Sequence, residues 1–276
     1  MRLRSLLFVP GDRPERFDKA AASGADAIIL DLEDSVASAR KAFARDAVAD
    51  YLAQPAGPVA RLVRINPVDS PWLRADLETA AAGQGLVLPK AEGAETFVRL
   101  DEAAADLALP PILPIATETP LAVFRMAEYA RFADRLLGLT WGAEDLPAAI
   151  GAAGSRDAAG LFTAPYEMVR ALALFAAHAA KTPAVETVYP DIRDLEGLAA
   201  YAARGAFDGF SGMMAIHPSQ VGVINLAFAP SAAALDQARA VVAAFANAPN
   251  VGAVQLDGRM LDAPHLKQAL RLLGEA

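Results

Sequence analysis

Short apolar runs alternate along the chain with longer segments in which apolar residues recur every three or four positions. The runs end at glycine, proline or acidic residues, which is typical of buried parallel strands. The longer segments have the periodicity of helices that bury one face. The pattern predicts eight strands, each followed by a helix, with the strands at residues 5–10, 27–33, 60–66, 85–90, 112–117, 135–141, 187–189 and 209–216.

Strict alternation of strands and helices favours a parallel sheet, and eight such units that close on themselves form a (β/α)8 TIM barrel. A doubly wound open sheet is the alternative. We favour the barrel because polar residues stand at the C-terminal ends of many strands, where barrels form active sites, whereas an open sheet would collect them at one switch point. These residues are Glu33, Arg64, Lys90, Glu118, Asp145 and His217.

The end of the chain exceeds what eight strand–helix units require. Two further stretches, residues 232–246 and 264–273, have helical periodicity and are separated by the polar segment 247–262. We therefore predict a catalytic barrel domain at residues 1–229. A C-terminal helical extension at residues 230–276 should pack on the barrel or on a neighbouring subunit.

The composition narrows the classes of function. With 276 residues, 54% of them hydrophobic, the chain can bury a large core in one main domain. No apolar run approaches the ~18 residues of a membrane span, and no signal peptide is recognisable, so neither membrane insertion nor export is expected. The absence of cysteine argues against disulfides and favours a cytoplasmic location. A net charge of −8 argues against nucleic-acid binding, which needs a basic face, and favours small-molecule chemistry.

Two carboxylates stand where neighbouring predicted strands end. Glu118 closes the segment PILPIATETP, and Asp145 closes LGLTWGAEDLP. Because these strand ends meet at one rim, both carboxylates can bind one Mg²⁺, which prefers two carboxylates completed by water and substrate oxygens. Alternatively, Asp145 caps the helix at Pro147 and Glu118 supports the helix start at Thr119. We predict the metal site, because the strand–acid–proline design occurs twice and capping needs only one of the pair.

Arg64 ends an otherwise apolar strand, VRIN, where a guanidinium is costly unless it is paired. It could bind a substrate carboxylate with two hydrogen bonds. A salt bridge to Glu33 or Glu118 is the alternative, and both can hold before substrate arrives. In the run AIILDLED, the strand period of two places Asp31 and Glu33 on one face, with Glu33 at the barrel mouth and Asp31 deeper.

Other polar residues near the rim allow more than one interpretation. Lys90 could form a Schiff base, although such a lysine more often pairs with surrounding acids. His217, in the segment IHPSQ, is as well explained by a structural role as by a functional one. Arg13, Arg16 and Lys19 follow the first strand and could bind phosphates of coenzyme A; a solvated helix face explains them equally well.

The motifs that carry these residues occur in order over nearly the whole chain. Together they resemble the citrate lyase beta-subunit-like family, whose relatives include malyl-CoA lyases and the HpcH/HpaI aldolases. The resemblance implies a barrel, Mg²⁺ bound by Glu118 and Asp145, and a 2-oxo acid bound by Arg64. It rests on the segments RSLLFVPGDRPERFDKA, LDLEDSV with Lys41 and Arg45 after it, VRIN, LPKAE, ATETP, LTWGAEDL, AIHPSQ and LDGRMLDAPHL.

The expected function is that of a Mg²⁺-dependent carbon–carbon lyase with Arg64, Asp262 and Glu33 as catalytic residues. Its substrate would be a 3-hydroxyacyl thioester such as citryl-CoA or malyl-CoA, cleaved to an acyl-CoA and a 2-oxo acid, or formed from them. One alternative is a metal-independent aldolase that uses Lys90. Another is a non-catalytic 2-oxo acid binder or a subunit that works with an acyl-carrier partner.

Asp262 corresponds to the second Asp of the family motif in LDGRMLDAPHL, which implies that it is the acid or base for the thioester half. It lies outside the eight barrel units, just before Pro264, and could also be only the cap of the last helix. We expect a neighbouring subunit to supply it, because an extension that covers an adjacent barrel mouth would exclude water. This arrangement implies a closed homotrimer or a hexamer.

Overall fold

The computed structural model describes residues 3–248 and 251–274. Contacts within the chain divide it into two compact units, residues 1–228 and residues 229–276. This boundary lies one residue from the one predicted from the sequence. The two units are described separately below.

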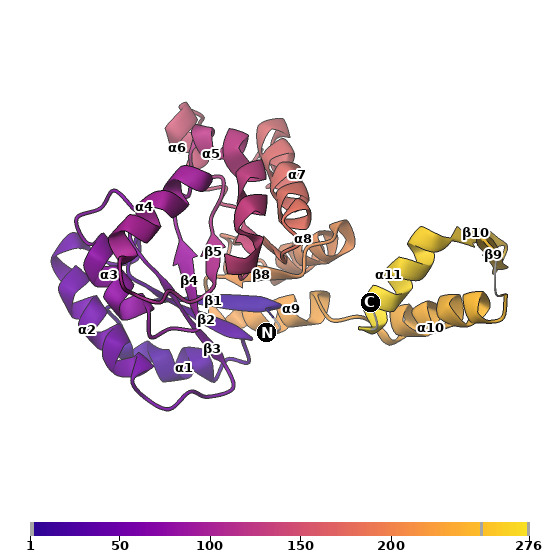
Figure 1. The fold of residues 1–276 in the computed structure, drawn as a ribbon, viewed down its shortest axis with the longest axis horizontal. Coiled ribbons are helices and arrows are strands. Elements are labelled where there is room, and N and C mark those ends of the chain that lie inside the picture. Colours follow the sequence, from indigo (N-terminus) through magenta and orange to yellow (C-terminus); the bar gives the residue numbers. More distant parts are fainter. Residues whose placement is uncertain (1–2, 249–250, 275–276) are drawn as a thin grey trace. The chain divides into compact units, whose positions relative to one another are not determined.

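The first unit is a (β/α)8 barrel, as predicted (Figure 1). All ladders in its sheet are parallel, in the order β5-β4-β3-β2-β1-β8-β7-β6. Isolated parallel bridges, Ile112 to Leu136 and Ile115 to Thr140, join the two ends of this order and close the barrel. The open-sheet alternative is therefore wrong. The strands are β1 Ser5–Pro10, β2 Ala27–Asp31, β3 Ala60–Arg64, β4 Gly85–Leu88, β5 Ile112–Pro114, β6 Leu139–Thr140, β7 Ala184–Glu186 and β8 Gly212–Ala215.

Helices follow the strands and lie around the outside of the sheet (Figure 1). They bury their apolar faces against the strands, which explains why most of the core lies between the two layers. Short 3₁₀ segments η1 Pro14–Arg16, η2 Ser38–Arg40 and η3 Met126–Arg135 accompany α1 Phe17–Ala21, α2 Lys41–Leu52, α3 Leu73–Ala80, α4 Ala94–Ala104, α5 Pro120–Arg125, α6 Leu146–Ile150, α7 Ala164–Ala179, α8 Leu195–Asp208 and α9 Pro218–Ala227.

A second apolar cluster fills the inside of the barrel, and the strand period of two decides which residues enter it. Along β2, Ile29 belongs to the inner cluster, whereas Ile28 and Leu30 belong to the outer one. The same alternation carries Asp31 inward at the C-terminal end of the strand, where its side chain is fully buried. The inner layer therefore ends in a polar rim.

The strands of the second half of the barrel differ from the prediction. β7 lies at residues 184–186 and not at 187–189. The apolar pattern did not reveal it, because it is three residues long and ends in Glu186. The Glu186 carboxylate is fully buried. Its burial is tolerated because it accepts hydrogen bonds from the side chains of Trp141, Arg170 and Tyr201. β6 has two residues instead of the seven predicted at 135–141, and η3 takes the first of these positions, Arg135.

The second unit is an antiparallel helix pair, α10 Ala232–Ala246 and α11 Ala263–Leu273, which lie side by side (Figure 1). The polar segment between them contains an unpredicted hairpin of β9 Ala253–Leu256 and β10 Arg259–Asp262. Its turn places Asp257 and Gly258 at φ values of 50° and 76°, a conformation that favours this residue pair. Residues 249–250 of the segment lie outside the described residues. No described helix is long and apolar enough to cross a membrane.

Candidate active site

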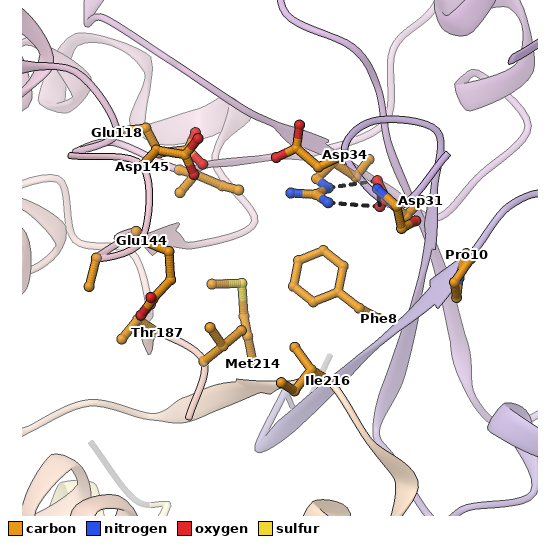
Figure 2. Close-up of a pocket in the computed structure, with 16 residues that line it drawn as sticks. Phe8, Pro10, Asp31, Asp34, Glu118, Glu144, Asp145, Thr187, Met214 and Ile216 are labelled. Carbon is orange, nitrogen blue, oxygen red and sulfur yellow. Dashed lines mark hydrogen bonds and ion pairs between the residues drawn. The ribbon is translucent and has the colours of Figure 1, made fainter. Parts of the chain in front are cut away.

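A pocket of about 460 Å³ opens at the C-terminal ends of the barrel strands. The carboxylates of Glu118, Asp145, Asp34 and Asp31 lie along one side of it (Figure 2). Apolar side chains lie along the opposite side, namely Phe8, Met214 and Ile216. The pocket therefore combines an acidic wall with an apolar wall. This shape suits a ligand with one polar, oxygen-rich end and one less polar end.

Glu118 and Asp145 line the same part of this pocket, as predicted for a shared cation. Neither carboxylate acts as a helix cap. The hydroxyl of Thr119 accepts the capping hydrogen bond from the Ala122 N–H at 3.2 Å, and Asp145 occupies the N-cap position of α6 without a side-chain capping bond. Asp145 therefore has the position that the capping alternative predicts, but its carboxylate makes no capping hydrogen bond. The two carboxylates remain directed into the pocket (Figure 2).

The Glu118 carboxylate is in an environment that disfavours its negative charge. It is buried, and its Oε2 accepts a hydrogen bond from the Lys90 backbone N–H at 2.5 Å. Burial, with the neighbouring carboxylates of Glu33 and Asp145, raises the pKa of Glu118 to about 8. A cation placed between Glu118 and Asp145 would relieve this repulsion.

The donor set fits Mg²⁺ better than a metal that needs a full protein cage. Among the described residues, no three His, Cys, Asp or Glu side chains form a metal-binding group. Two carboxylates next to an open pocket leave coordination positions for water and substrate oxygens, which Mg²⁺ favours. Gly142 lies against Glu118, because a Cβ atom at Gly142 would come within 2.9 Å of the Glu118 Cγ. The absence of a side chain there lets the Glu118 carboxylate face Asp145.

Arg64 lies at the end of β3 and lines the pocket, as expected. Its Nε and Nη2 atoms each donate to an Asp31 carboxylate oxygen at 2.7 Å, the pair of dashed lines in Figure 2. Its Nη1 lies 2.9 Å from Glu33 Oε2. Asp31 is thus the main partner, which the sequence did not indicate, and Glu118 is not a partner of Arg64 in the described contacts. Burial would lower the pKa of Arg64, but the Asp31 charge raises it, so the guanidinium is a permanent cation.

Glu33 follows the C-terminal end of β2 by two residues, but its side chain does not line the pocket. It is 3% exposed and contacts Arg64 and Lys90. Burial raises its pKa, although Arg64 and Lys90 oppose the effect. In this position Glu33 orients two cations. Its predicted catalytic role remains a prediction.

Lys90 forms ion pairs and does not present a free amine. Its Nζ lies 2.6 Å from Glu33 Oε1 and 3.7 Å from Asp145 Oδ1. Burial would lower its pKa, but the hydrogen bond with Glu33 and the charges of Glu33, Glu118 and Asp34 together raise it. Its backbone has a φ of 48°, a left-handed conformation that costs a non-glycine residue about 1 kcal/mol and turns the N–H towards Glu118. A raised pKa is the opposite of what Schiff-base chemistry needs.

Lys41 holds the loop that carries Glu33 in place. Its ammonium is buried and donates to the carbonyls of Leu32 and Glu33 at 2.6 and 2.7 Å and to Asn66 Oδ1 at 2.7 Å. Asn66 in turn donates to the buried Asp76 at 2.6 Å. A lysine eight residues after an acidic strand end is a weak signal by itself, so the sequence alone did not reveal this contact.

A second pocket, of about 440 Å³, lies beside the first and shares Phe8, Pro10 and Ile216 with it. Arg16, Lys19 and His217 line it. The structure thus brings together two of the three cations predicted to bind coenzyme A, along with the histidine. Arg13 does not line this pocket. The His217 ring also caps α9, because its Nδ1 accepts a hydrogen bond from the Ser219 N–H at 3.2 Å.

Asp262 lies in the second unit, at the N-cap position of α11. Its backbone N–H donates to the His265 Nδ1 at 3.2 Å, and its carboxylate Oδ1 lies 2.5 Å from the same nitrogen. Asp262 therefore has the helix-capping position that was the alternative to a catalytic role. The carboxylate is about half exposed, which leaves it accessible to a ligand. The catalytic role of Asp262 remains a prediction.

Comparisons with known proteins agree with this architecture. Residues 4–218 match the family model described as HpcH/HpaI aldolase/citrate lyase. A citrate lyase subunit beta-like protein of Mycobacterium tuberculosis is 41% identical, over 98% of this chain and 95% of the relative. A (3S)-malyl-CoA thioesterase of Cereibacter sphaeroides is 35% identical, over 99% of this chain and 94% of the relative.

Solved structures are similar over the same length. The crystal structure of CitE from M. tuberculosis in complex with magnesium, acetoacetate and coenzyme A has a TM-score of 0.85 and 39% sequence identity. The comparison covers 100% of this chain and 98% of that chain. Sequence motifs, barrel fold and full-length similarity lead to one assignment. The chain belongs to the HpcH/HpaI aldolase/citrate lyase family.

Proposed function

We propose that this protein is a Mg²⁺-dependent carbon–carbon lyase acting on a 3-hydroxyacyl thioester of the citryl-CoA or malyl-CoA type. Cleavage would give an acyl-CoA such as acetyl-CoA and a 2-oxo acid such as oxaloacetate, glyoxylate or pyruvate, and the reaction could also run as a condensation. The observation that carries the proposal is that Glu118, Asp145 and Arg64 line one pocket. The magnesium and coenzyme A in the related CitE structure support it.

Glu118 and Asp145 would hold the metal, and Arg64 would bind the acid half of the substrate. Bound Mg²⁺ supplies Lewis-acid stabilisation of oxygens that gain negative charge. Arg64 keeps N–H groups for a substrate, because Asp31 takes Nε–H and one Nη2–H while Glu33 faces Nη1 only. Asp31 and Glu33 fix the guanidinium plane, so that no reorganisation is needed as charge develops.

The bond changes define what the remaining residues must do. The substrate hydroxyl loses its proton, its oxygen forms the carbonyl of the 2-oxo acid, and the breaking carbon–carbon bond leaves its electrons on the thioester half as an enolate. A proton delivered to that carbon completes the acyl-CoA. Asp262 is our candidate for this proton transfer, because it corresponds to the second Asp of the family motif in LDGRMLDAPHL.

Coenzyme A would enter through the second pocket. Arg16 and Lys19 provide the positive charge that its phosphates need, and His217 lies on the same wall. The walls shared with the first pocket, Phe8 and Ile216, give the thioester arm an apolar path between the two. Arg13 is at most a peripheral contact. A carrier-bound thioester would need the same path, so an acyl-carrier partner remains the alternative.

The direct test is incubation with malyl-CoA and with citryl-CoA, with and without Mg²⁺. We expect release of glyoxylate or oxaloacetate together with acetyl-CoA only when the metal is present. Glu118→Ala and Asp145→Ala should each abolish turnover and Mg²⁺ binding while circular dichroism stays native, since removing one carboxylate also removes charge repulsion. Full activity of either variant in EDTA would eliminate the metal from the mechanism.

Thioester hydrolysis is a second candidate function, because the C. sphaeroides relative is a (3S)-malyl-CoA thioesterase. The same assay separates the two activities. A lyase converts malyl-CoA into glyoxylate and acetyl-CoA, with no free thiol. A thioesterase releases malate and the free thiol of coenzyme A instead, which a thiol reagent detects directly.

The remaining alternatives predict different results in the same experiments. A Schiff-base aldolase would be labelled at Lys90 by borohydride with pyruvate and would keep its activity in EDTA; the ion pairs and raised pKa of Lys90 count against it. A non-catalytic binder would bind 2-oxo acids without turnover. A cytoplasmic location remains an expectation from the sequence.

A further inference from the structure

The contact between β5 and β6 differs from the other seven contacts between neighbouring strands of the barrel. Those seven form parallel ladders of two or more residue pairs, whereas β5 and β6 are joined only by isolated bridges. Backbone hydrogen bonds cross this seam from Leu137 N–H to Ile112 O at 2.8 Å and from Ala116 N–H to Thr140 O at 2.9 Å. The two chain segments then continue to Glu118 and Asp145. The barrel is thus least regular where the proposed metal ligands are attached.

A single side chain ties the two segments together beyond the last of these backbone bonds. The Thr117 hydroxyl donates to the Gly142 carbonyl at 2.9 Å and accepts from the Gly142 N–H at 2.9 Å. Thr117 is fully buried, so water does not compete for these bonds. The Thr117 hydroxyl therefore replaces a pair of backbone hydrogen bonds that a regular ladder would have at this position.

The position of this contact links it to both carboxylates. Thr117 directly precedes Glu118, and Gly142 lies three residues before Asp145. Gly142 also packs against the Glu118 side chain, where a Cβ atom would clash. A shift of one segment past the other would therefore change the separation of the two carboxylates. Mg²⁺ tolerates such a change poorly, because it demands near-ideal octahedral geometry.

We propose that Thr117 is a positioning residue that sets the spacing of Glu118 and Asp145 for Mg²⁺ through its paired hydrogen bonds with Gly142. This inference rests on the proposed metal site and adds a residue to it that does not touch the metal. Outer partners that orient ligands commonly change metal affinity by about 10 to 100-fold. The effect should therefore appear in binding, before any catalysis.

The chain offers a control on β6 whose side chain does not cross the seam. The Thr140 hydroxyl is also fully buried and donates to the Val185 carbonyl at 2.9 Å. That bond joins β6 to β7, so the hydroxyl does not tie the Glu118 segment to the Asp145 segment. Thr140→Val should also lower the melting temperature, because it too loses a buried hydroxyl. The decrease should be larger in Thr117→Val, which loses two hydrogen bonds instead of one. Only Thr117→Val should weaken the metal site.

The experiment measures Mg²⁺ affinity by calorimetry and Mn²⁺ affinity by electron paramagnetic resonance, without substrate. We expect Thr117→Val to bind both ions at least about tenfold more weakly than wild type. Thr117→Ser, which keeps the hydroxyl, and Thr140→Val should bind within about threefold of wild type. If Thr117→Val does not fold, Thr117→Ala provides the same comparison.

Two results would overturn the inference. One is wild-type affinity in Thr117→Val or Thr117→Ala. The other is equal weakening in Thr117→Ser and Thr117→Val, because the methyl packing and not the hydroxyl would then be responsible. If the proposed metal site does not exist, wild type would bind Mg²⁺ no better than Glu118→Ala does. That result is distinct from the two above.

Discussion

Asp31 and Glu118 are both buried carboxylates at the barrel rim, yet their pKa values move in opposite directions. Burial raises the pKa of each. At Asp31 the Arg64 guanidinium outweighs burial and holds the pKa below its ordinary value. Glu118 accepts only a backbone N–H from Lys90 and faces other carboxylates, so its pKa rises to about 8. Asp31 is thus a constant anion, whereas Glu118 needs a cation to ionise fully at neutral pH.

The raised pKa of Glu118 predicts how the metal-free protein responds to pH. A carboxyl that binds its proton more tightly in the folded state stabilises the fold below its unfolded pKa, and this contribution is lost as pH rises through the folded value. A shift from 4.5 to about 8 corresponds to roughly 4–5 kcal/mol. We expect the free energy of unfolding in EDTA to fall between pH 5 and about pH 8, measured by denaturant titration.

Glu118→Gln is the control for this pH effect, because its amide keeps the shape and cannot ionise. In this variant the free energy of unfolding should fall less between pH 5 and about pH 8. Mg²⁺ should restore the stability that wild type loses in this range, whereas it should not stabilise the variant. Glu33, whose pKa is also raised, should contribute to any slope that remains. An unchanged slope in Glu118→Gln would show that Glu118 does not titrate in this range.

Arg64 should not tolerate replacement by lysine. A lysine ammonium cannot keep both hydrogen bonds to Asp31 and also reach a substrate carboxylate, so we expect Arg64→Lys to lower kcat/KM at least about a hundredfold. Arg61, also on β3, donates to the backbone carbonyls of Tyr51 and Pro55 outside the pocket. Arg61→Lys should lower stability but keep kcat/KM within about threefold. Equal kinetic losses in both variants would contradict a substrate-binding role.

At the scale of elements, the loops after β2 and β3 depend on Lys41, the first residue of α2. Lys41→Met should remove this charged donor from the carbonyls of Leu32 and Glu33, at a cost of about 1.5–3 kcal/mol for each hydrogen bond lost. Each carbonyl keeps one other hydrogen bond. Glu33 would then hold Arg64 and Lys90 less firmly. We expect kcat to fall more than KM rises, measured by steady-state kinetics at saturating Mg²⁺.

Chemical rescue separates this positioning role from simple destabilisation. The chain has no cysteine, so Lys41→Cys provides a single thiol. Alkylation of the unfolded variant with bromoethylamine, followed by refolding, restores an ammonium at nearly the original length. Recovery of kcat after aminoethylation, but not after methylation, is the expected outcome. Wild type taken through the same treatment is the control.

At the scale of the whole molecule, we predict that a neighbouring subunit supplies Asp262 to the catalytic site. Asp262 lies in the C-terminal unit, whereas the other candidate residues lie in the barrel. If the extension of one subunit completes the site of another, Asp262→Asn and Glu118→Ala should each be nearly inactive. Mixed at equal amounts with subunit exchange, they should regain about a quarter of the sites, one half times one half.

Three results of the mixing experiment lead to different conclusions. Recovery to about a quarter supports a shared site in a closed oligomer, whose size light scattering would measure. No recovery, despite exchange proven by mass spectrometry, places Asp262 in the site of its own chain. Full turnover of Asp262→Asn alone means that Asp262 is only the N-cap of α11 and that the proton comes from elsewhere.

The sequence by itself determined the barrel and the carboxylates of its rim. Strand and helix periods are local properties, so the apolar patterns of 27–33 and 232–246 predicted β2 and α10 closely. Parallel strands bring their C-terminal ends to one rim, which is why acids after separate strands were expected to meet. Glu118 and Asp145 did so. This inference needed only the order of the elements.

Only the tertiary structure decided which of these side chains pair. Asp31 binds Arg64, Lys90 turns through a left-handed backbone towards Glu118, and Thr117 bridges the irregular seam at Gly142. Such contacts depend on the register between strands and on the paths of the loops. Both are set by packing between segments far apart in the chain, and no local pattern of apolar and polar residues encodes them.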